Sequence, residues 1–287
     1  MPEKYFKEQK LSGCLASDLA CERGRAAPGM PGVEFKCYNA GEFLWERLKI
    51  TTEEGSKSIG RPIGNYDTLT VKNMTELDED DIEDASNELA KELCLMLDRL
   101  GTSPGRLLVV GLGNKNLTPD SIGPRAAEKI NATMHIKKYE KSLFYDFGCS
   151  EIAVCSPGVM AKTGMEAAEI ITAICDRIEP DAVLAIDSLA SKSSQRLGKT
   201  IQICDTGIFP GSGIGNPRYP LNIGTLGTHV IAIGVPTVIN TRMLTEREIL
   251  SEITEEEMFV SPREIDEIAE ISSKIIAQGI NQAFGIF

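Results

Sequence analysis

The chain is poor in histidine: its 287 residues include only His135 and His229. A Ser-His-Asp triad, a Cys-His pair or a multi-histidine metal site would have to use one of these two. His135 follows an amphipathic stretch and His229 directly precedes an expected strand, so a surface and a structural role are expected for them. The scarcity favours chemistry carried by carboxylates, and we expect no metal ion and no other cofactor.

Two further absences bear on the compartment. The eight cysteines contain no C-x-x-C pair, which argues against a structural zinc site and is typical of reduced thiols in the cytoplasm. The longest apolar run, Val230 to Ile239, contains Gly234 and Pro236 and is too short to span a bilayer. The first ten residues are polar and charged, unlike a secretory signal. We expect a cytoplasmic protein with no membrane partner.

Positive charge is also in deficit, with 30 Lys and Arg against 42 Asp and Glu and a net charge of −12. An acidic surface repels phosphate and attracts basic proteins, so direct nucleic-acid binding is not expected. No P-loop is present, and Gly111-x-Gly113-Asn114 lacks the third glycine of a dinucleotide fingerprint. That turn instead predicts backbone N–H groups at a sheet edge, where they could hold a peptide carbonyl.

Apolar runs and helical periodicity alternate through most of the chain. Residues 1–32 are rich in charge, glycine and proline and predict a non-core arm. Beyond them the pattern predicts one α/β domain, with a mostly parallel twisted sheet covered by helices on both faces. The expected strands are 33–38, 43–50, 66–71, 107–110, 152–155, 182–187, 200–204 and 230–235, and the main helices are 82–100, 164–178 and 262–284.

Two aspartates follow buried strands of this pattern. Asp120 comes shortly after the run 107–110, and Asp187 closes the run 182–187. In open α/β sheets, ligands bind just beyond the carboxyl ends of the strands. Two carboxylates brought close together cannot both ionise easily, so one keeps its proton and the pair offers an acid and a base. Metal ligation and capping remain the alternatives for strand-end aspartates.

Three weaker candidates lie nearby. Asp205 also ends a strand and is either a third acid or a turn former. The glycine-rich loop 207–216, with Gly211 and Gly213, is either a surface connection or a loop whose backbone approaches a ligand. Ser188, Ser191 and Lys192 are either a Ser–Lys nucleophile pair or caps and solvated charge at a helix start.

Several longer strings occur in collinear order, densely from about residue 105 onward and more loosely before it. They are VVGLGN at 109–114, TPDSIGP at 118–124, SPGVM at 156–160, TGME at 163–166, AIDSLA at 185–190, DTGIFPGSG at 205–213, IGVPTV at 233–238 and VSPREID at 260–266. Together they resemble the germination protease (spore endopeptidase) family of spore-forming bacteria.

This resemblance implies an endopeptidase that initiates the degradation of small acid-soluble, DNA-protecting spore proteins during germination. It implies an atypical aspartic mechanism in which the two proposed catalytic aspartates fall on Asp120 and Asp187. It also implies a homotetramer in the spore core, with a fold related to that of the hydrogenase maturation endopeptidases.

The resemblance further implies a self-processing zymogen. Residues 16–22 (ASDLACE) resemble the family's processing site, with serine in place of threonine, and their small residues and flanking charge predict an accessible extended segment. Cleavage between Asp18 and Leu19 would leave 1–18 as the pro-segment and 19–287 as a single peptidase domain. The alternative is a disordered tail with no control function.

Two rival functions stay open on the sequence. One is a metal-dependent processing endopeptidase of the hydrogenase-maturation type, which would need a ligand set of Asp, Glu and His that the chain does not offer in a matching place. The other is a catalytically inactive binding scaffold that keeps the fold.

Overall fold

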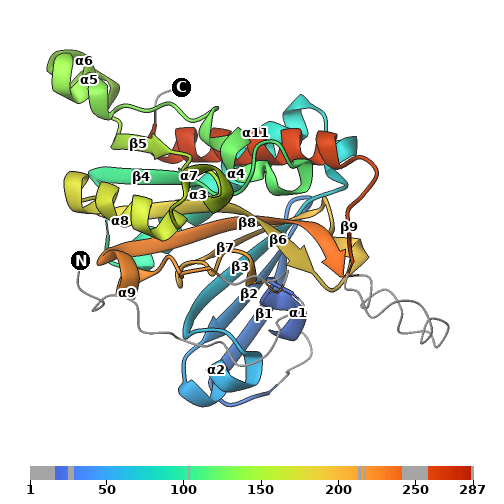
Figure 1. Cartoon of the computed structure of the whole chain (residues 1–287). Coiled ribbons are helices and arrows are strands. Elements are labelled where there is room, and N and C mark those ends of the chain that lie inside the picture. The colour runs from blue at the N-terminus through green and yellow to red at the C-terminus, as the bar shows by residue number, and fades with distance from the viewer. Residues whose placement is uncertain are drawn as a thin grey trace.

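A nine-stranded sheet with helices on both faces forms the body of the protein (Figure 1). The computed structural model describes residues 17–24, 29–102, 104–212, 215, 218–240 and 258–285. The expected α/β class and the cover of helices on both faces are confirmed. The strands are β1 (Val33–Ala40), β2 (Phe43–Ile50), β3 (Gly64–Thr70), β4 (Arg106–Gly111), β5 (Glu151–Cys155), β6 (Ala182–Ser191), β7 (Thr200–Cys204), β8 (His229–Asn240) and β9 (Phe259–Val260).

The sheet is mixed, which corrects the expectation of a mostly parallel one. Its strand order is β1-β2-β3-β7-β8-β6-β4-β5, with β9 paired to β8. The pairs β4–β5, β4–β6 and β6–β8 are parallel, whereas the pairs from β8 through β7, β3 and β2 to β1 are antiparallel. Antiparallel neighbours can be joined by a tight turn, as β1 and β2 are, whereas parallel pairs need crossovers.

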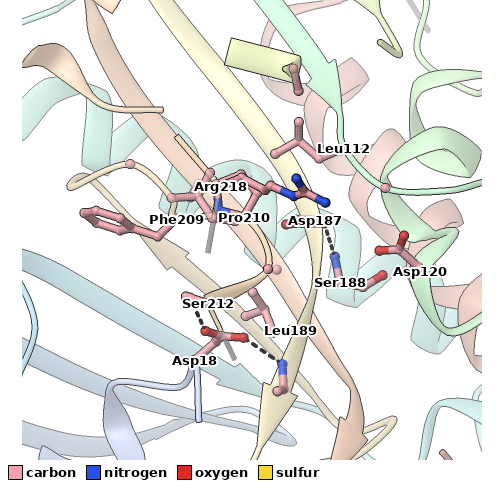
Figure 2. A pocket seen from close by; sticks show the side chains of 18 of the residues that line it. Asp18, Leu112, Asp120, Asp187, Ser188, Leu189, Phe209, Pro210, Ser212 and Arg218 are labelled. Carbon is pink, nitrogen blue, oxygen red and sulfur yellow. Dashed lines mark hydrogen bonds between the residues drawn. The ribbon is translucent and has the colours of Figure 1, made fainter. Parts of the chain in front are cut away.

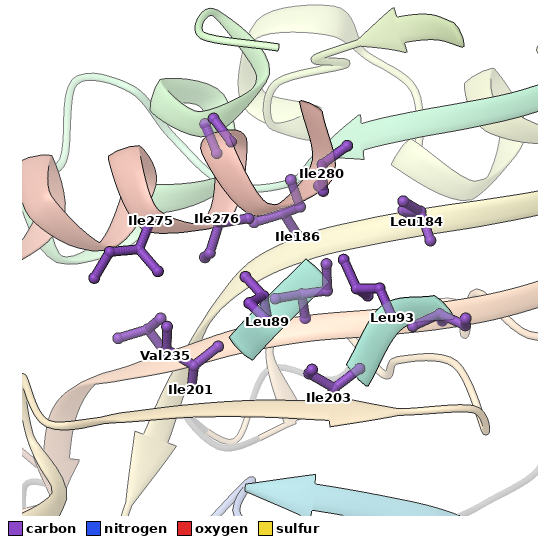
Figure 3. Packing of buried hydrophobic residues seen from close by; sticks show 14 of the residues in the cluster. Leu89, Leu93, Leu184, Ile186, Ile201, Ile203, Val235, Ile275, Ile276 and Ile280 are labelled. Atoms are coloured by element: carbon purple, nitrogen blue, oxygen red, sulfur yellow. The ribbon is translucent and has the colours of Figure 1, made fainter. Parts of the chain in front are cut away.

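Successive residues of the central strands alternate between two cores. Leu184 and Ile186 of β6 face the first core, and Val183 and Ala185 face the second. Helices α3 (Glu79–Arg99), α4 (Ile122–Ala127) and α11 (Ile265–Phe284) cover the first core, where Leu89 of α3 and Ile276 of α11 meet the sheet (Figure 3). Helix α8 (Ala167–Ile178) covers the second. Even-numbered residues of this part of β6 therefore face the first core, and odd-numbered residues face the second.

The acidic run before α3 is the helix start rather than an independent feature. The carboxylate of Asp78 caps the helix by accepting a hydrogen bond from the backbone N–H of Asp81, and the carboxylate of Asp81 accepts one from the backbone N–H of Asp78. Carboxylates in a first helical turn also interact favourably with the helix dipole. Leu89, Leu93 and Leu97 are spaced by four residues along one face of the helix, and all three are buried.

The region after Asp187 differs from the expectation. β6 continues to Ser191, so Ser188, Ser191 and Lys192 do not begin a helix, and that interpretation is wrong. The strand continues because β8 runs on beside it to Asn240, with a register shift between Leu189 and Ala190. The remaining elements are α1 (Cys21–Gly24), α2 (Glu53–Ile59), η2 (Met74–Glu76), η3 (Thr118–Asp120), α5 (Met134–Tyr139), α6 (Lys141–Phe147), α7 (Met160–Thr163), η4 (Ser194–Arg196) and α9 (Ile223–Leu226).

Among the helices that the structure describes, none combines the length and the apolar character needed to cross a membrane.

Two glycines bring α4 against the end of β4. A side chain on Gly111 would place its Cβ 2.2 Å from the carbonyl oxygen of Gly123. A Cβ on Gly123 would lie 2.2 Å from the oxygen of Leu112 and 2.5 Å from that of Ile186. Only glycine permits such a close backbone approach, and the contact fixes the segment that leads from β4 to Asp120.

We predict that Gly123→Ala destabilises the fold, because its methyl group would overlap backbone oxygens that cannot rotate away. Overpacking of this kind costs about 1–3 kcal/mol, and we expect the upper end. Gly105→Ala is the matched control, since its Cβ would meet only the Asp181 carboxylate at an ordinary 3.6 Å. Urea unfolding of both variants measures the difference, and equal midpoints would contradict the prediction.

Candidate functional site

Asp187 lies where β6 continues past the end of β4. The parallel pairing places Gly111 beside Ile186, and the N–H of Leu112 donates to the oxygen of Ile186 over 2.8 Å. Asp187 follows directly and is 6% exposed. Its carboxylate accepts a hydrogen bond from the N–H of Ser188 over 2.9 Å. The expectation that Asp187 closes its own strand is wrong, because β6 continues to Ser191. Asp187 instead adjoins the carboxyl end of the parallel neighbour β4.

Asp120 is held by the turn that follows β4. The N–H of Asn114 donates to both the backbone oxygen and the carboxylate of Asp120, each over 2.9 Å. Gly113, at φ +109°, closes this turn, and a Cβ there would lie 2.2 Å from the Asp120 oxygen. The N–H of Asn114 is thus occupied by Asp120. This hydrogen bond fixes the carboxylate of Asp120 at the mouth of the turn.

The electrostatics of the two aspartates differ. Burial raises the pKa of Asp187 well above its usual value, and the charge of Asp120 raises it further, against the hydrogen bond from Ser188. Burial also raises the pKa of Asp120, while the N–H of Asn114 lowers it. Asp187 is therefore the carboxyl group that keeps a proton more readily, and Asp120 the one that ionises first.

Both aspartates line one cavity of about 520 Å³ (Figure 2). Its walls come from the ends of β4 and β6, from the loop after β7 and from the N-terminal segment. Ser212, Phe209 and Arg218 contribute from the loop, and Arg218 forms an ion pair with Glu166 over 3.3 Å. The functional alternative for this glycine-rich loop is thereby favoured over a plain surface connection. Gly211 lines the cavity, whereas Gly213 lies outside the described residues.

Asp18 also lines this cavity, and its carboxylate occupies a pocket of its own. It accepts hydrogen bonds from the N–H of Ala190 over 2.9 Å and from the hydroxyl of Ser212 over 2.8 Å (Figure 2). The guanidinium of Arg61, itself 9% exposed, lies 3.8 Å away. Burial still raises the pKa of Asp18, with Arg61 and the two hydrogen bonds opposing it.

Glu22 is held in a second polar pocket, four residues along the chain. Its carboxylate accepts from the hydroxyl of Ser191 over 2.7 Å, from the N–H of Lys192 over 3.1 Å and from the N–H of Ser193 over 3.2 Å. Consecutive N–H groups arranged in this way bind anions well. Arg196 adds an ion pair at 3.9 Å. Ser191 and Lys192 therefore serve this contact and form no Ser–Lys pair.

The residues between these two pockets are part of the second core. Leu19 is 1% exposed, and Ala20 and Cys21 are fully buried. The expectation of an accessible extended segment at 16–22 is therefore wrong for the residues described, because the chain turns them inward and begins α1 at Cys21. Asp18 lines the same cavity as Asp120 and Asp187, and Leu19, on the other side of the predicted bond, is buried in the second core.

Gln202 on β7 is a site residue that the sequence did not indicate. Its side-chain amide donates to the carbonyl oxygen of Asp18 over 3.1 Å and accepts from the N–H of Ala20 over 2.7 Å. It is 7% exposed and lines the cavity. Within the strand TIQIC, Gln202 is the one polar residue that is not β-branched. This exception is the feature by which the sequence could have indicated a site residue.

Asp205 has a different role from the candidate pair. Its two carboxylate oxygens accept from the N–H of Asn65 over 2.8 Å and from the side-chain amide of Asn65 over 2.5 Å. It is not among the described residues that line the cavity. This supports the turn-forming alternative, in which Asp205 ties the end of β7 to the start of β3.

No group of three or more His, Cys, Asp or Glu side chains within the described ranges is arranged to hold a metal ion. Asp120 and Asp187 line the same cavity, where two carboxyl groups could exchange protons with a bound peptide.

Known proteins resemble the chain over most of its length. The family model for germination protease matches residues 16–249. The chain is 38% identical to the germination protease of Clostridium tetani over 94% of its own length and 95% of the relative's. It is 43% identical to that of Oceanobacillus iheyensis over 84% of this chain and 68% of the relative.

A likeness among solved structures is much weaker. The [NiFe] hydrogenase maturation protease HycI from Thermococcus kodakarensis is 19% identical, with a TM-score of 0.36, over 64% of this chain and 98% of the other. A similarity at this level carries no conclusion about chemistry.

We predict that Asp187→Asn makes the protein more stable than the wild type at neutral pH. The stability linked to a carboxyl with a raised pKa is complete below its unfolded pKa of about 3.9 and is lost as the pH rises through the folded pKa. Asparagine cannot ionise, so the variant's advantage should widen above about pH 4. Melting temperatures at pH 4, 5.5 and 7 measure it, with the exposed Asp146→Asn as control. An advantage that shrinks as the pH rises would contradict the raised pKa.

Proposed function

The chain belongs to the germination protease family, and from this premise we propose that it is an endopeptidase using Asp120 and Asp187 as a paired acid and base. The observation that carries the proposal is the cavity that three aspartates share. Two carboxyl groups with raised pKa values share one cavity with Asp18 of the chain's own N-terminal segment.

The proposed mechanism divides the proton transfers between the two carboxyl groups. Asp120, the more readily ionised, takes a proton from a water molecule whose oxygen bonds to the peptide carbonyl carbon. Asp187, which keeps its proton, gives it to the leaving nitrogen as the C–N bond breaks. The products are a carboxylic acid and an amine, and the pair is reset when Asp120 loses and Asp187 regains a proton.

The proposed substrates are the small acid-soluble spore proteins, and the proposed setting is the spore core during germination. Family membership supports both, and the net charge of −12 is compatible with attraction of DNA-binding proteins. A homotetramer is proposed on the same basis. Neither a nucleic acid nor a membrane is proposed as a partner.

We also propose that the protein is made as a zymogen that cuts itself between Asp18 and Leu19. The buried position of this bond favours cleavage within one chain, since another molecule could reach it only after residues 18–22 leave the groove. While it is bound there, the segment excludes any other substrate. Residues 1–18 would then be the pro-segment and 19–287 the peptidase domain.

The metal-dependent endopeptidase remains the rival enzyme and the inactive scaffold the rival of another class. The former needs ligands beyond Asp120 and Asp187, which the described residues do not supply at this place. The latter predicts no cleavage under any condition. Activity measurements on the same purified protein distinguish the three.

We predict that Asp120→Asn and Asp187→Asn each lower the cleavage of a purified small acid-soluble spore protein by roughly 10²- to 10⁴-fold, the contribution typical of general acid–base groups. Asparagine keeps the shape and the acceptor oxygen but cannot transfer the proton. Initial rates measure the effect, with circular dichroism to verify folding. Asp205→Asn should stay within a few-fold of the wild type.

EDTA and reagents for serine or cysteine should leave the wild-type rate unchanged in the same assay. Loss of activity on EDTA treatment, restored by a metal ion, would move the conclusion to the metal-dependent enzyme. Absence of cleavage by a correctly folded wild-type protein would favour the scaffold.

We predict that the full-length chain converts to a form beginning at Leu19 when it is incubated at mildly acidic pH, which favours the protonated carboxyl. N-terminal sequencing identifies the new end. Because Asp18 lines the cavity of its own chain, the rate constant for self-cleavage should not depend on protein concentration. A full-length chain that cleaves the spore protein as fast as one beginning at Leu19 would refute the zymogen.

A further inference from the structure

The carbonyl group of Asp18 has one side-chain hydrogen-bond donor, and it comes from Gln202. The amide nitrogen of Gln202 lies 3.1 Å from that carbonyl oxygen, and its amide oxygen accepts from the N–H of Ala20 over 2.7 Å. These contacts reach backbone groups alone, so any peptide bound along the same path could make them. Gln202 is therefore placed to bind the backbone of a substrate, whatever side chains that substrate carries.

The sheet places Gln202 opposite Asp187. Gly234 of β8 pairs with Asp187 on one side and with Gln202 on the other. Residues paired across strands project from the same face, and two strand spacings separate the two backbones by roughly 10 Å. Asp187, Gly234 and Gln202 all line the cavity, and the side chain of Leu189 packs against Gly234 on this face. A peptide held by Gln202 therefore borders the cavity that Asp187 lines.

The register of the bound segment is fixed independently of Gln202. The N–H of Asp18 donates to the oxygen of Ala190 over 2.8 Å, and Arg61 and Ser212 hold the Asp18 carboxylate. The pocket of Glu22 anchors the other end. Because these contacts hold residues 18–22 in place, loss of the hydrogen bond that Gln202 donates should leave the segment docked.

We propose that Gln202 is a catalytic residue that stabilises the negative charge developing on the carbonyl oxygen of the bond being cleaved. This rests on the proposed function, in which water adds to the Asp18 carbonyl carbon. Gln202 donates a hydrogen bond and exchanges no proton, so the proton transfers of Asp120 and Asp187 are unchanged. A buried donor aimed at a developing oxyanion strengthens in the transition state, because no water must reorganise there.

The test is self-cleavage of the full-length chain carrying Gln202→Glu. Glutamate keeps the acceptor for Ala20 and the shape of the side chain but removes the N–H donor. Loss of one such donor slows acyl transfer by roughly 10²- to 10³-fold, and we expect a first-order rate lowered by that factor. Gln195→Glu, at an exposed position in η4, is the matched control and should cleave at the wild-type rate.

Docking of the segment is measured separately, by alkylation of Cys21 followed by mass spectrometry. Cys21 belongs to the docked segment and is fully buried, whereas Cys37 is exposed and reports full reactivity in the same sample. Gln202→Glu should keep Cys21 protected while cleavage slows. Arg61→Gln should instead increase the alkylation of Cys21, because it removes a contact that positions the segment.

Two outcomes would overturn the inference. One is a Gln202→Glu chain that cleaves itself at the wild-type rate. The other is slow cleavage accompanied by full exposure of Cys21, which would make Gln202 a docking contact only. Failure of the proposed function looks different, because neither the wild-type chain nor any variant would then cleave itself or the spore protein.

Discussion

The burial of two carboxyl groups at the shared edge of β4 and β6 is the constraint on which the rest of the site depends. Parallel pairing places Asp187 beside the end of β4, and the glycine contact between β4 and α4 fixes the segment that leads to Asp120. Burial raises the pKa of both carboxyl groups, and the charge of Asp120 raises that of Asp187 further. The same burial that costs stability supplies the protonated carboxyl group that the proposed mechanism requires.

The cavity lies where the sheet changes from parallel to antiparallel strand pairing. β4, β6 and β8 run parallel and bring the aspartates to one edge, whereas β7 runs antiparallel to β8 and supplies Gln202. Ligands of α/β sheets bind where the strand arrangement switches, and the N-terminal segment occupies such a position here. In the proposed mechanism the acid–base groups therefore come from the parallel half of the sheet, and a backbone-binding group comes from the antiparallel half.

The N-terminal segment is both ligand and core. Asp18 and Glu22 are held by polar pockets, and the three residues between them pack into the second core. Breaking the bond after Asp18 does not by itself remove these contacts, so residues 19–24 would have to leave before a spore protein could take their place. Control of the proposed enzyme would then depend on release of the segment as well as on cleavage.

The sequence alone determined the α/β class, the main strands and helices, and the placement of Asp120 after one buried strand and of Asp187 on another, because periodicity is a local feature. Its motifs also indicated the family. Only the tertiary structure decided that the sheet is mixed, that Asp205 binds Asn65 instead of joining the pair, and that Asp18 lies against Gln202. Those choices depend on pairing between segments far apart in the chain, as with residues 18 and 202, and no local pattern encodes which strand edges will meet.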